Sequence, residues 1–310
     1  MTGRLYERLA IVGCGLIGSS LARIARETGV VGEIVVADAS EAHRGRIEAL
    51  GLADLVTGDI GAAVDGADLV VLAVPVLAIG EAMAAAAPKL KPGATVTDVG
   101  SVKGSAAEAM AADAPEGVFV IPGHPIAGTE HSGPDAGFAE LFDGRWTILT
   151  PQPREDAAYA EAVARLAAFW RRCGAQVEVM DVRHHDLVLA ITSHLPHLIA
   201  YNIVGTASDL EGVTEGEVMK YSAGGFRDFT RIAASDPTMW RDIFVANKDA
   251  VLEVLGRFTE DLSALQRAIR WGEADKLHEL FTRTRAIRRG VIALGQESAE
   301  PNFGRDRGKH

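Results

Sequence analysis

The sequence predicts an α/β fold: a doubly wound, mostly parallel sheet followed by a second, all-α domain. Short runs rich in Val, Ile and Leu alternate with alanine-rich helical stretches from Leu9 to about Met180, as in a parallel sheet covered on both faces. After Asp181 this strand pattern stops, and apolar residues recur at three- and four-residue spacing as far as Leu294. These observations predict two domains, residues 1–181 and 182–296, and a polar tail, residues 297–310, that we expect to be disordered.

Seven segments of the first domain have the composition of buried strands, being rich in β-branched and large apolar residues between turn-forming residues. Right-handed crossovers between these strands would place the intervening helices on both faces of one sheet. The predicted strands are Leu9 to Val12, Ile34 to Ala37, Leu69 to Ala73, Thr95 to Thr97, Val118 to Ile121, Thr147 to Leu149 and Gln176 to Val179.

A glycine fingerprint, Gly13-Cys14-Gly15-Leu16-Ile17-Gly18, stands between the first predicted strand and a predicted helix from Ser19 to Arg26. The first glycine permits a tight turn, the second lets the backbone approach a pyrophosphate, and the third lets the helix pack closely on the strand. The helix N-terminus would then face the phosphates. A plain glycine-rich turn is the simpler interpretation, but strand, glycines, helix and a second strand ending at Asp38 together favour a Rossmann-type dinucleotide site.

Asp38, which lies 20 residues after the last of these glycines, indicates which dinucleotide is bound. Its carboxylate would accept hydrogen bonds from the ribose hydroxyls and repel a 2′-phosphate, which favours NAD over NADP. A Lys or Arg from elsewhere in the chain could still reach such a phosphate. Val74 and Pro75 follow the third strand and are expected to line the cofactor, although a strand-ending proline without a ligand is an open alternative. The predicted cofactor-binding residues are Gly13, Gly15, Leu16, Ile17, Gly18, Asp38, Val74 and Pro75.

Composition and charge narrow the classes of partner. The chain has 310 residues, 48% of them hydrophobic and 24% charged, and a formal net charge of −11. This acidity argues against nucleic acid or an anionic membrane surface as the main partner, so an anionic ligand must be met by local cations. Cys14 and Cys173 lack metal-ligand spacing and fit a reducing compartment. Neither a signal peptide nor a stretch of about 18 apolar residues is evident, and we expect a cytoplasmic protein without a membrane span.

Ligands of open α/β sheets bind beyond the carboxyl ends of the strands, where two polar residues of this sequence are expected. Ser101 follows the predicted strand Thr95 to Thr97 and lies near a helix start, so it is either a helix cap or a substrate contact. His124 follows the strand Val118 to Ile121, between a glycine and a proline. Removal of a hydride from a carbinol carbon requires an acceptor for the hydroxyl proton, and imidazole has a suitable pKa. The segment leads into a glycine-rich loop, and a structural loop histidine is the open alternative, but we predict that His124 is catalytic and that Ser101 could share the hydroxyl.

The second domain contributes histidines and arginines to the candidate site. His194 and His197 are three residues apart on a predicted helix and could hold a metal together with Asp186. The chemistry we consider needs no metal, however, and we expect none. In so acidic a chain, Arg227 and Arg231, which follow a glycine pair, are interpreted as carboxylate binders. An exposed salt bridge is the open alternative for Arg227.

Several strings, in a fixed order, give the sequence a family resemblance. They are the glycine fingerprint, Asp98 to Lys103, GHPIAGTE at 123–130, SHLPH at 193–197, and GGFRDFTRIAASDP at 224–237 followed by TMWRD. Many dehydrogenases share the first string, but the GHPIAGTE, SHLPH and GGFRDFTRIAASDP strings are specific, and together the matches span nearly the whole chain. The sequence resembles the prephenate/arogenate dehydrogenase family.

The resemblance implies an NAD(P)-dependent oxidative decarboxylation in tyrosine biosynthesis, of prephenate to 4-hydroxyphenylpyruvate or of arogenate to tyrosine. By motif match, His124 would accept a hydrogen bond from the ring hydroxyl as hydride leaves, Ser101 would hold the same hydroxyl, and Arg231 would bind the ring carboxylate. The family also implies a homodimer built through the helical domain, with Asp228 near the shared site. The further substrate-binding residues implied are His197, Thr129, Glu130, Gly224, Arg227 and Trp240.

The reaction itself is consistent with these few groups. Loss of hydride from the carbon para to the carboxylated ring carbon creates a dienone that accepts the electrons of the breaking C–C bond, and aromatisation drives the step. The enzyme has to orient the substrate and manage one proton. No chorismate mutase segment is evident before Gly13, so we expect a monofunctional enzyme. Two alternatives stay open, another two-domain NAD(P)-dependent dehydrogenase acting on a 3-hydroxyacid and a non-catalytic NAD-responsive regulator, as does the choice between prephenate and arogenate.

Overall fold

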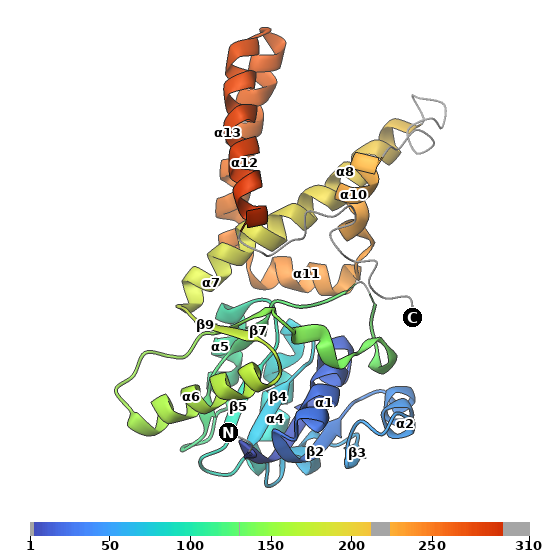
Figure 1. Ribbon diagram of the computed structural model, residues 1–310, viewed down its shortest axis with the longest axis vertical. Coiled ribbons are helices and arrows are strands. Elements are labelled where there is room, and N and C mark those ends of the chain that lie inside the picture. The colour runs from blue at the N-terminus through green and yellow to red at the C-terminus, as the bar shows by residue number, and fades with distance from the viewer. Residues whose placement is uncertain (1–2, 130, 212–223, 294–310) are drawn as a thin grey trace. The chain divides into compact units, whose positions relative to one another are not determined.

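The computed structural model describes residues 3–129, 131–211 and 224–293, drawn as coloured ribbon in Figure 1. Within these ranges the chain forms two compact units, one that extends to Leu252 and one that begins at Glu253. Each unit is described by itself.

A six-stranded parallel sheet forms the centre of the first unit, in the order β3-β2-β1-β4-β5-β6. In β1, Leu9 pairs with Ile34 of β2 on one side and with Leu69 of β4 on the other. Strands so rich in β-branched residues and leucine suit a sheet that is covered on both faces. The strands are β1 (Tyr6–Val12), β2 (Val31–Ala37), β3 (Leu55–Thr57), β4 (Leu69–Leu72), β5 (Thr95–Asp98) and β6 (Phe119–Val120).

Helices cover both faces of this sheet. Because successive strand residues point to opposite faces, Leu9 and Ile11 of β1 pack in one buried cluster with α1 and α6. Ala10 and Val12 pack in a second cluster with α3, α4 and α5. The predicted doubly wound, mostly parallel Rossmann-type sheet is therefore confirmed. The helices are α1 (Leu16–Thr28), α2 (Glu41–Ala49), α3 (Ile60–Val64), α4 (Ile79–Ala86), α5 (Lys103–Ala112) and α6 (Ala157–Arg172).

A separate three-stranded sheet, in the order β7-β8-β9, differs from the prediction of a single sheet. β7 (Gly123–Pro125) runs antiparallel to β8 (Trp146–Leu149), and β8 runs parallel to β9 (Gln176–Val179). Phe119 and Ile121 donate their backbone N–H groups to the strand β5 side, but the next amide in this pattern, that of Gly123, donates to the Asp98 side chain instead, so the ladder with β5 ends after Ile121. The sequence analysis missed β7, which it assigned to a loop, and β3, whose three residues are too few to show a periodic pattern.

The described chain after β9 is helical, as predicted for the second domain. α7 (Val182–Leu189) continues through a π-helical turn, η5 (Ala190–His194), into α8 (Leu195–Glu211). The later elements are α10 (Gly224–Thr230), the 3₁₀ turn η6 (Arg231–Ala234), α11 (Pro237–Ala246), α12 (Lys248–Arg270) and α13 (Ala274–Ala293). The predicted domain boundary coincides with the N-cap of α7, Asp181, and stays a prediction. The predicted tail lies outside the described residues.

One helical stretch among the described residues, Val182–Leu210, is long and apolar enough to cross a membrane by length and composition alone. The sequence analysis had identified no stretch of this kind. Core helices of globular proteins have the same properties, so the stretch by itself does not indicate a membrane protein. Its buried side chains include His185, Asp186 and His194, which belong to the candidate site.

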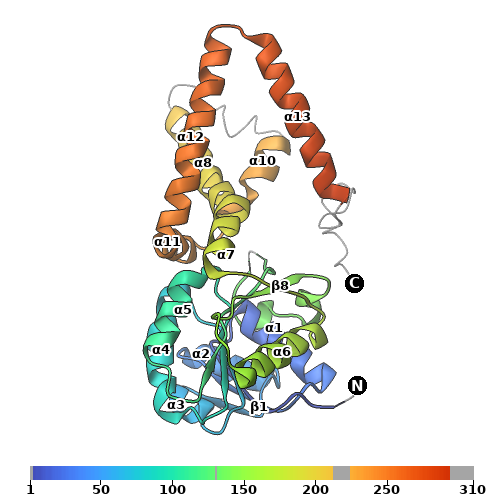
Figure 2. The same ribbon diagram turned by 90° about the vertical axis from the view of Figure 1, so that its left-hand side faces the viewer.

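The second unit consists of α12 from Glu253 onward and α13. The chain turns between them at Gly272, which has a φ of +65° that favours glycine. Figure 2 shows the two helices diverging from this turn. Large apolar side chains are exposed along the pair, namely Leu262, Ile269, Trp271, Phe281 and Ile287. The unit therefore carries an apolar surface that its own packing does not cover.

Candidate active site

The glycine fingerprint forms the turn between β1 and α1, at the carboxyl edge of the parallel sheet. Gly13 has a φ of +89°, and a Cβ there would stand 2.5 Å from the carbonyl oxygen of Ala73. A Cβ on Gly18 would collide with the carbonyl oxygen of Gly13. The close packing of the turn therefore requires both glycines. A Cβ on Gly15, in contrast, would meet nothing within 4 Å, which leaves the approach to the backbone open where the fingerprint predicts a pyrophosphate.

The N-terminus of α1 suits an anionic ligand. Its N-cap is Gly15, which has no side chain to accept the first amides, and Leu16 and Ile17 begin the helix. No acidic residue lies in the first turn. Uncapped amides and the positive end of the helix dipole favour a phosphate group there. The residues present at this turn therefore fit a dinucleotide.

Asp38 lies at the end of β2 and is 9% exposed. One of its carboxylate oxygens accepts the backbone N–H of Cys14 at 2.9 Å, and the other accepts that of Ser40 at 2.9 Å. Two basic side chains of α2 stand beside it: Nδ1 of His43 is 3.4 Å from the carboxylate, and Arg44 donates to the Asp38 carbonyl oxygen at 2.9 Å. The Asp38 carboxylate is thus held where the fingerprint predicts the ribose, and the side chains of His43 and Arg44 lie beside it.

Val74 and Pro75 follow β4 at the same edge of the sheet. The Val74 side chain packs against the glycine turn, with Cγ1 3.1 Å from the position of a Cβ on Gly13. Pro75 is exposed and precedes the short helix η1 (Val76–Ala78). The structure brings Val74 to the glycine turn, and the role of Pro75 stays a prediction.

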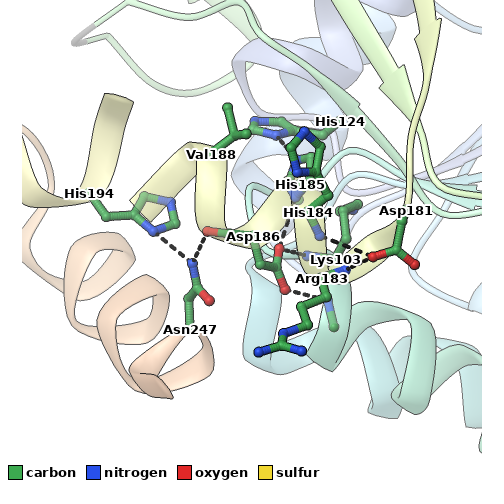
Figure 3. A network of polar contacts seen from close by, with 12 residues as sticks. Lys103, His124, Asp181, Arg183, His184, His185, Asp186, Val188, His194 and Asn247 are labelled. Atoms are coloured by element: carbon green, nitrogen blue, oxygen red, sulfur yellow. Dashed lines mark hydrogen bonds and ion pairs between the residues drawn. The ribbon is translucent and has the colours of Figure 1, made fainter. Parts of the chain in front are cut away.

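His124 lies in β7, which passes close to the end of β5 because its first residue is a glycine: a Cβ on Gly123 would stand 2.9 Å from Oγ1 of Thr97. The imidazole of His124 is buried, and its Nδ1 lies 2.9 Å from Nε2 of His185. His185 Nδ1 lies in turn 2.8 Å from Oδ1 of Asp186. Figure 3 shows these contacts leading from His124 to the first turns of α7.

Asp186 also caps α5. Its two carboxylate oxygens accept the backbone N–H groups of Lys103 and Gly104, each at 2.8 Å. Ser101 stands two residues before this helix, whose N-cap residue is Val102 without a side-chain cap. The structure therefore does not support the cap alternative for Ser101, whose hydroxyl has no hydrogen-bond partner among the described residues.

A fully buried ion pair, Lys103 with Asp98, lies next to His124. The Lys103 ammonium donates to Asp98 and, at 2.6 Å, to the carbonyl oxygen of Gly123. Asp98 accepts the backbone N–H of Gly123 at 3.1 Å. Burial lowers the pKa of Lys103, against the opposing attraction of Asp98. The pair ties the end of β5 to β7 and so fixes the position of His124.

The imidazoles of His124 and His185 are neutral at pH 7. Burial lowers the pKa of His124 well below the ordinary value of 6.5, and it is lowered further by the charges that His185 and His194 carry when protonated and by the charge of Lys103. Burial also lowers the pKa of His185, although the Asp186 carboxylate opposes this shift. A neutral imidazole can accept a proton at one ring nitrogen, which is the capacity that the sequence analysis assigned to His124.

The ring of His194 is held by a different residue, Asn247. Its Nδ1 lies 3.1 Å from the amide nitrogen of Asn247, which also donates to the backbone carbonyl of Asp186 at 2.9 Å. Burial lowers the pKa of His194 to about 4. Its Nε2 is buried and has no hydrogen-bond partner among the described residues. A buried polar atom without a partner is costly unless a ligand or water completes it.

Three side chains lie close together in the helical part of the chain after β9: those of His197, Trp240 and Arg231. The rings of His197 and Trp240 stack with centroids 3.6 Å apart. Nδ1 of His197 lies 2.9 Å from the carbonyl oxygen of Ser193. Burial lowers the pKa of His197, and the nearby Arg231 guanidinium lowers it further. Arg231 itself is exposed at the start of η6 and has no carboxylate partner among the described residues.

Of the other predicted substrate residues, Gly224 and Arg227 lie exposed in α10, and Arg227 forms no ion pair within the described ranges. Thr129 is exposed and accepts the backbone N–H of His131 at 3.2 Å. Glu130 lies outside the described residues. The structure does not place these residues against His124, and their roles stay predictions. Where the chain is described, no group of three or more His, Cys, Asp or Glu side chains is arranged to hold a metal ion.

The sequence analysis missed Lys103, His185 and Asn247 as parts of this site and considered Asp186 only as a metal ligand. A usable signal was present in α7. His185, Asp186, Leu189 and Ala190 form its buried face at three- and four-residue spacing, so two titratable residues occupy apolar positions of the helical pattern. Titratable residues at such positions are rarely buried without a partner or a function.

Two family profiles match the chain. One is described as prephenate dehydrogenase, nucleotide-binding domain, and matches residues 21–179. The other is described as prephenate dehydrogenase, dimerization domain, and matches residues 181–283. This chain belongs to the prephenate dehydrogenase family. The family predicted from the sequence motifs is thereby confirmed.

Individual relatives within the family agree with this assignment. The chain is 45% identical to a cyclohexadienyl dehydrogenase of Zymomonas mobilis over 92% of this chain and 96% of the relative. A crystal structure of prephenate dehydrogenase from Aquifex aeolicus, in complex with hydroxyphenyl propionate and NAD+, matches with a TM-score of 0.84 and 35% identity, covering 92% of this chain and 98% of that one. Synechocystis arogenate dehydrogenase matches with a TM-score of 0.78 and 26% identity, over 92% and 99% of the two chains.

Proposed function

We propose that this chain is an NAD-dependent dehydrogenase that oxidises prephenate, arogenate or both with loss of carbon dioxide. The observation that carries the proposal is a buried, neutral imidazole, His124, at the carboxyl edge of a sheet whose glycine turn fits a dinucleotide. The names of the relatives support the substrate class, since they include cyclohexadienyl, prephenate and arogenate dehydrogenases. Family membership leaves the alternative of a 3-hydroxyacid dehydrogenase without support.

The glycine turn and Asp38 would hold NAD, which would supply the acceptor for the hydride of the ring carbon that bears the hydroxyl. His124 accepts the proton of that hydroxyl as the C–O bond gains double-bond character. The bond between the ring and its carboxylate then breaks and carbon dioxide leaves. The electron pair of that bond completes the aromatic ring and puts negative charge on the ring oxygen, which takes the proton back from His124. The protein therefore has to hold one hydroxyl beside His124 and keep the imidazole unprotonated, which burial of His124 supports.

Ser101 and Arg231 are proposed to orient the substrate. The hydroxyl of Ser101 is not used as a helix cap, so it is free to hold the substrate hydroxyl together with His124. Arg231 carries a guanidinium without a carboxylate partner among the described residues, and it lies near His197. A guanidinium binds a carboxylate with two parallel hydrogen bonds, which fixes orientation as well as charge. The net charge of −11 makes such a local cation necessary for a dianionic substrate.

The preference for NAD over NADP is proposed to depend on the charge of Asp38. Replacing Asp38 by Asn keeps an oxygen that can accept the Cys14 amide but removes the charge that would repel a 2′-phosphate. His43 and Arg44 would then be left beside that position. We expect the ratio of kcat/KM with NADP to kcat/KM with NAD to rise by about tenfold or more.

The matched control is Glu41→Gln, which removes the same charge from the exposed first turn of α2. The control should leave the cofactor ratio unchanged. An unchanged ratio in the Asp38→Asn protein would show that the selectivity lies elsewhere.

A homodimer through the helical part of the chain is also proposed. The matching profile of residues 181–283 is described as a dimerization domain. The exposed apolar side chains of α12 and α13 supply a surface of the kind that a second copy would cover. We further propose a location in a reducing compartment such as the cytoplasm, supported by the free, buried Cys14 and Cys173.

The direct test of function is a steady-state assay of the purified full chain. Prephenate and arogenate are each supplied with NAD and with NADP, and absorbance of the reduced cofactor is followed. The proposal expects NAD reduction with at least one of the two substrates, accompanied by carbon dioxide. Absence of turnover with both substrates, in a protein shown by calorimetry to bind NAD, would favour the non-catalytic regulator instead.

A further inference from the structure

We propose that His185 and Asp186 act as positioning residues that hold His124 in the tautomer with its proton on Nδ1, leaving Nε2 free to accept. This inference rests on the proposed function for its catalytic meaning, but the tautomer itself depends on the hydrogen bonds and on the protonation of Asp186 and His185, not on activity. None of the sequence motifs pointed to it, because the two residues lie in α7 and His124 lies in β7.

Asp186 can act only as an acceptor in its hydrogen bonds. Its two carboxylate oxygens accept the amides of Lys103 and Gly104 at the start of α5. These amides, together with His185, lower the pKa of Asp186 below its ordinary value despite burial. The carboxylate is therefore ionised at neutral pH and has no proton to give. The ring nitrogen that lies 2.8 Å from it, Nδ1 of His185, must be the one that carries a proton.

The contact with Asp186 also fixes the tautomer of His185. Its ring is fully buried and its pKa is lowered, so at neutral pH it carries one proton, and that proton is on Nδ1. Nε2 of His185 is then an acceptor. The tautomer of an imidazole is set by the partner of its other nitrogen.

The tautomer of His185 in turn fixes the tautomer of His124. Its Nδ1 lies 2.9 Å from the accepting Nε2 of His185, so Nδ1 of His124 must donate. The neutral ring has no second proton, and Nε2 is left as a bare acceptor. The reversed order would set an unprotonated Nδ1 of His185 against the Asp186 carboxylate, two acceptors facing each other at hydrogen-bond distance. A reversed order would require either a protonated Asp186 or a doubly protonated His185, and the lowered pKa of each group opposes this at neutral pH.

Among the residues that the structure describes, no other group competes with His185 for the hydrogen bond to Nδ1 of His124. The groups that face it from the neighbouring elements are His185 of α7, Lys103 of α5 and His194 of η5, with Asp98 of β5 behind Lys103. Lys103 donates to Asp98 and to the carbonyl of Gly123 rather than to the imidazole. Figure 3 shows the His185 ring between His124 and Asp186. The tautomer of His124 therefore depends on α7.

The closing experiment has two parts, and the first needs no substrate. Nitrogen-15 NMR of the full chain labelled at histidine distinguishes protonated from bare ring nitrogens, and the signals of His124 are assigned by their loss in His124→Asn. At pH 7.5 we expect His124 to show a protonated Nδ1 and a bare Nε2. A protonated Nε2 would overturn the proposal, whatever the activity of the protein.

The second part separates positioning from general structure. His185→Leu removes the acceptor, whereas His185→Gln offers a carbonyl oxygen in its place, and His184→Leu changes the exposed neighbouring histidine as a control. We expect kcat to fall by at least about tenfold in His185→Leu and by less in His185→Gln, with KM for NAD unchanged in all three. Wild-type kcat in His185→Leu, or no advantage of Gln over Leu, would overturn the proposal. If the wild-type chain shows no turnover at all, the proposed function fails while the NMR result still decides the tautomer.

Discussion

His124, His194 and His197 are each tied through Nδ1, but to partners of different hydrogen-bonding character. Nδ1 of His197 faces a backbone carbonyl and must donate, which leaves its Nε2 as an acceptor. Nδ1 of His194 faces the amide nitrogen of Asn247, whose orientation is fixed because it also contacts a carbonyl. Nδ1 of His194 therefore accepts, and its buried Nε2 carries a proton without a described partner. With the proposed tautomer of His124, the Nε2 atoms of His124 and His197 are acceptors and that of His194 is a donor.

Arg231 provides a prediction about substrate binding. Replacing Arg231 by Ala removes the guanidinium proposed to hold the ring carboxylate. Hydrogen bonds to a charged group contribute about 1.5–3 kcal/mol, so KM for the substrate should rise by about 10- to 100-fold. KM for NAD should not change. Steady-state kinetics with varied substrate and saturating NAD measure both effects.

The control for Arg231 is Arg257→Ala, which removes an exposed arginine whose one ion pair within the described part of the chain is with Asp261, at 3.4 Å. Such a surface pair contributes little to stability. Unchanged KM and kcat in Arg231→Ala would mean that another cation holds the carboxylate.

Individual residues of the cofactor site could be predicted because their role is local. Gly13 and Gly18 are required by a turn that spans only a few residues, and the fingerprint states that requirement directly. The contacts of His124 could not be predicted, because His185 is 61 positions away and no local pattern joins them. Hydrogen bonds between distant segments depend on the packing of whole elements.

The helix pair α12 and α13 gives a prediction about assembly. Phe281 is 55% exposed near the middle of α13, where an apolar side chain of that size is unfavourable in water. Phe281→Glu would place a charge within the proposed dimer surface, and we expect the protein to become largely monomeric at micromolar concentration. Analytical ultracentrifugation gives the mass, and the wild-type chain should sediment as a dimer.

The control variant, Arg283→Glu, lies two positions along α13 on the opposite side of the helix and introduces a larger change of charge. It should remain dimeric. A wild-type mass of one chain, or a dimeric Phe281→Glu protein, would contradict this assignment of the surface.

Elements with long, regular patterns were predicted well, and short ones were not. The strands β1 and β2 have seven residues each, which show a buried apolar pattern. β7 has three residues, two of which are Gly and Pro, and it becomes a strand only because β8 is there to pair with it. The π-helical turn η5, which helps to set the directions of His194 and His197, has no sequence signal that we recognise.

The buried histidines make the stability of the whole chain depend on pH. His124, His185, His194 and His197 all have a folded-state pKa below the unfolded value of 6.5. The unfolded chain therefore binds more protons than the folded chain below pH 6.5, and stability is lost as pH falls towards the folded-state values. For His194, with a pKa of about 4, the free energy of unfolding should fall by up to about 1.4 kcal/mol per pH unit across this window.

Urea unfolding at a series of pH values from 7.5 to about 4.5 measures this dependence. His194→Gln should flatten the curve between these limits, whereas His184→Gln, which replaces an exposed histidine, should not. Equal curves for the wild type and His194→Gln would show that His194 is not held neutral in the folded state.

The fold class, the order of the elements and the family could be predicted for the chain as a whole, because periodicity and motifs survive in the sequence. The division of the strands between two sheets could not, since it depends on where the chain leaves the first sheet after Ile121. The contact between His124 of β7 and His185 of α7, which organises the site, follows from that division. The sequence therefore singled out His124 as the candidate catalytic imidazole, a role that stays a prediction, but gave no sign of the residues that hold it.

The central claim, that His124 accepts the substrate proton, is tested most directly by the turnover of His124→Asn. Asparagine at this position cannot take up a proton, and loss of a positioned acid–base group lowers kcat by about two to four orders of magnitude. The dissociation constant for NAD, measured by calorimetry on the same protein, should stay within about twofold of the wild type, because no contact of the glycine turn changes. A His124→Asn protein with nearly wild-type kcat would contradict the account.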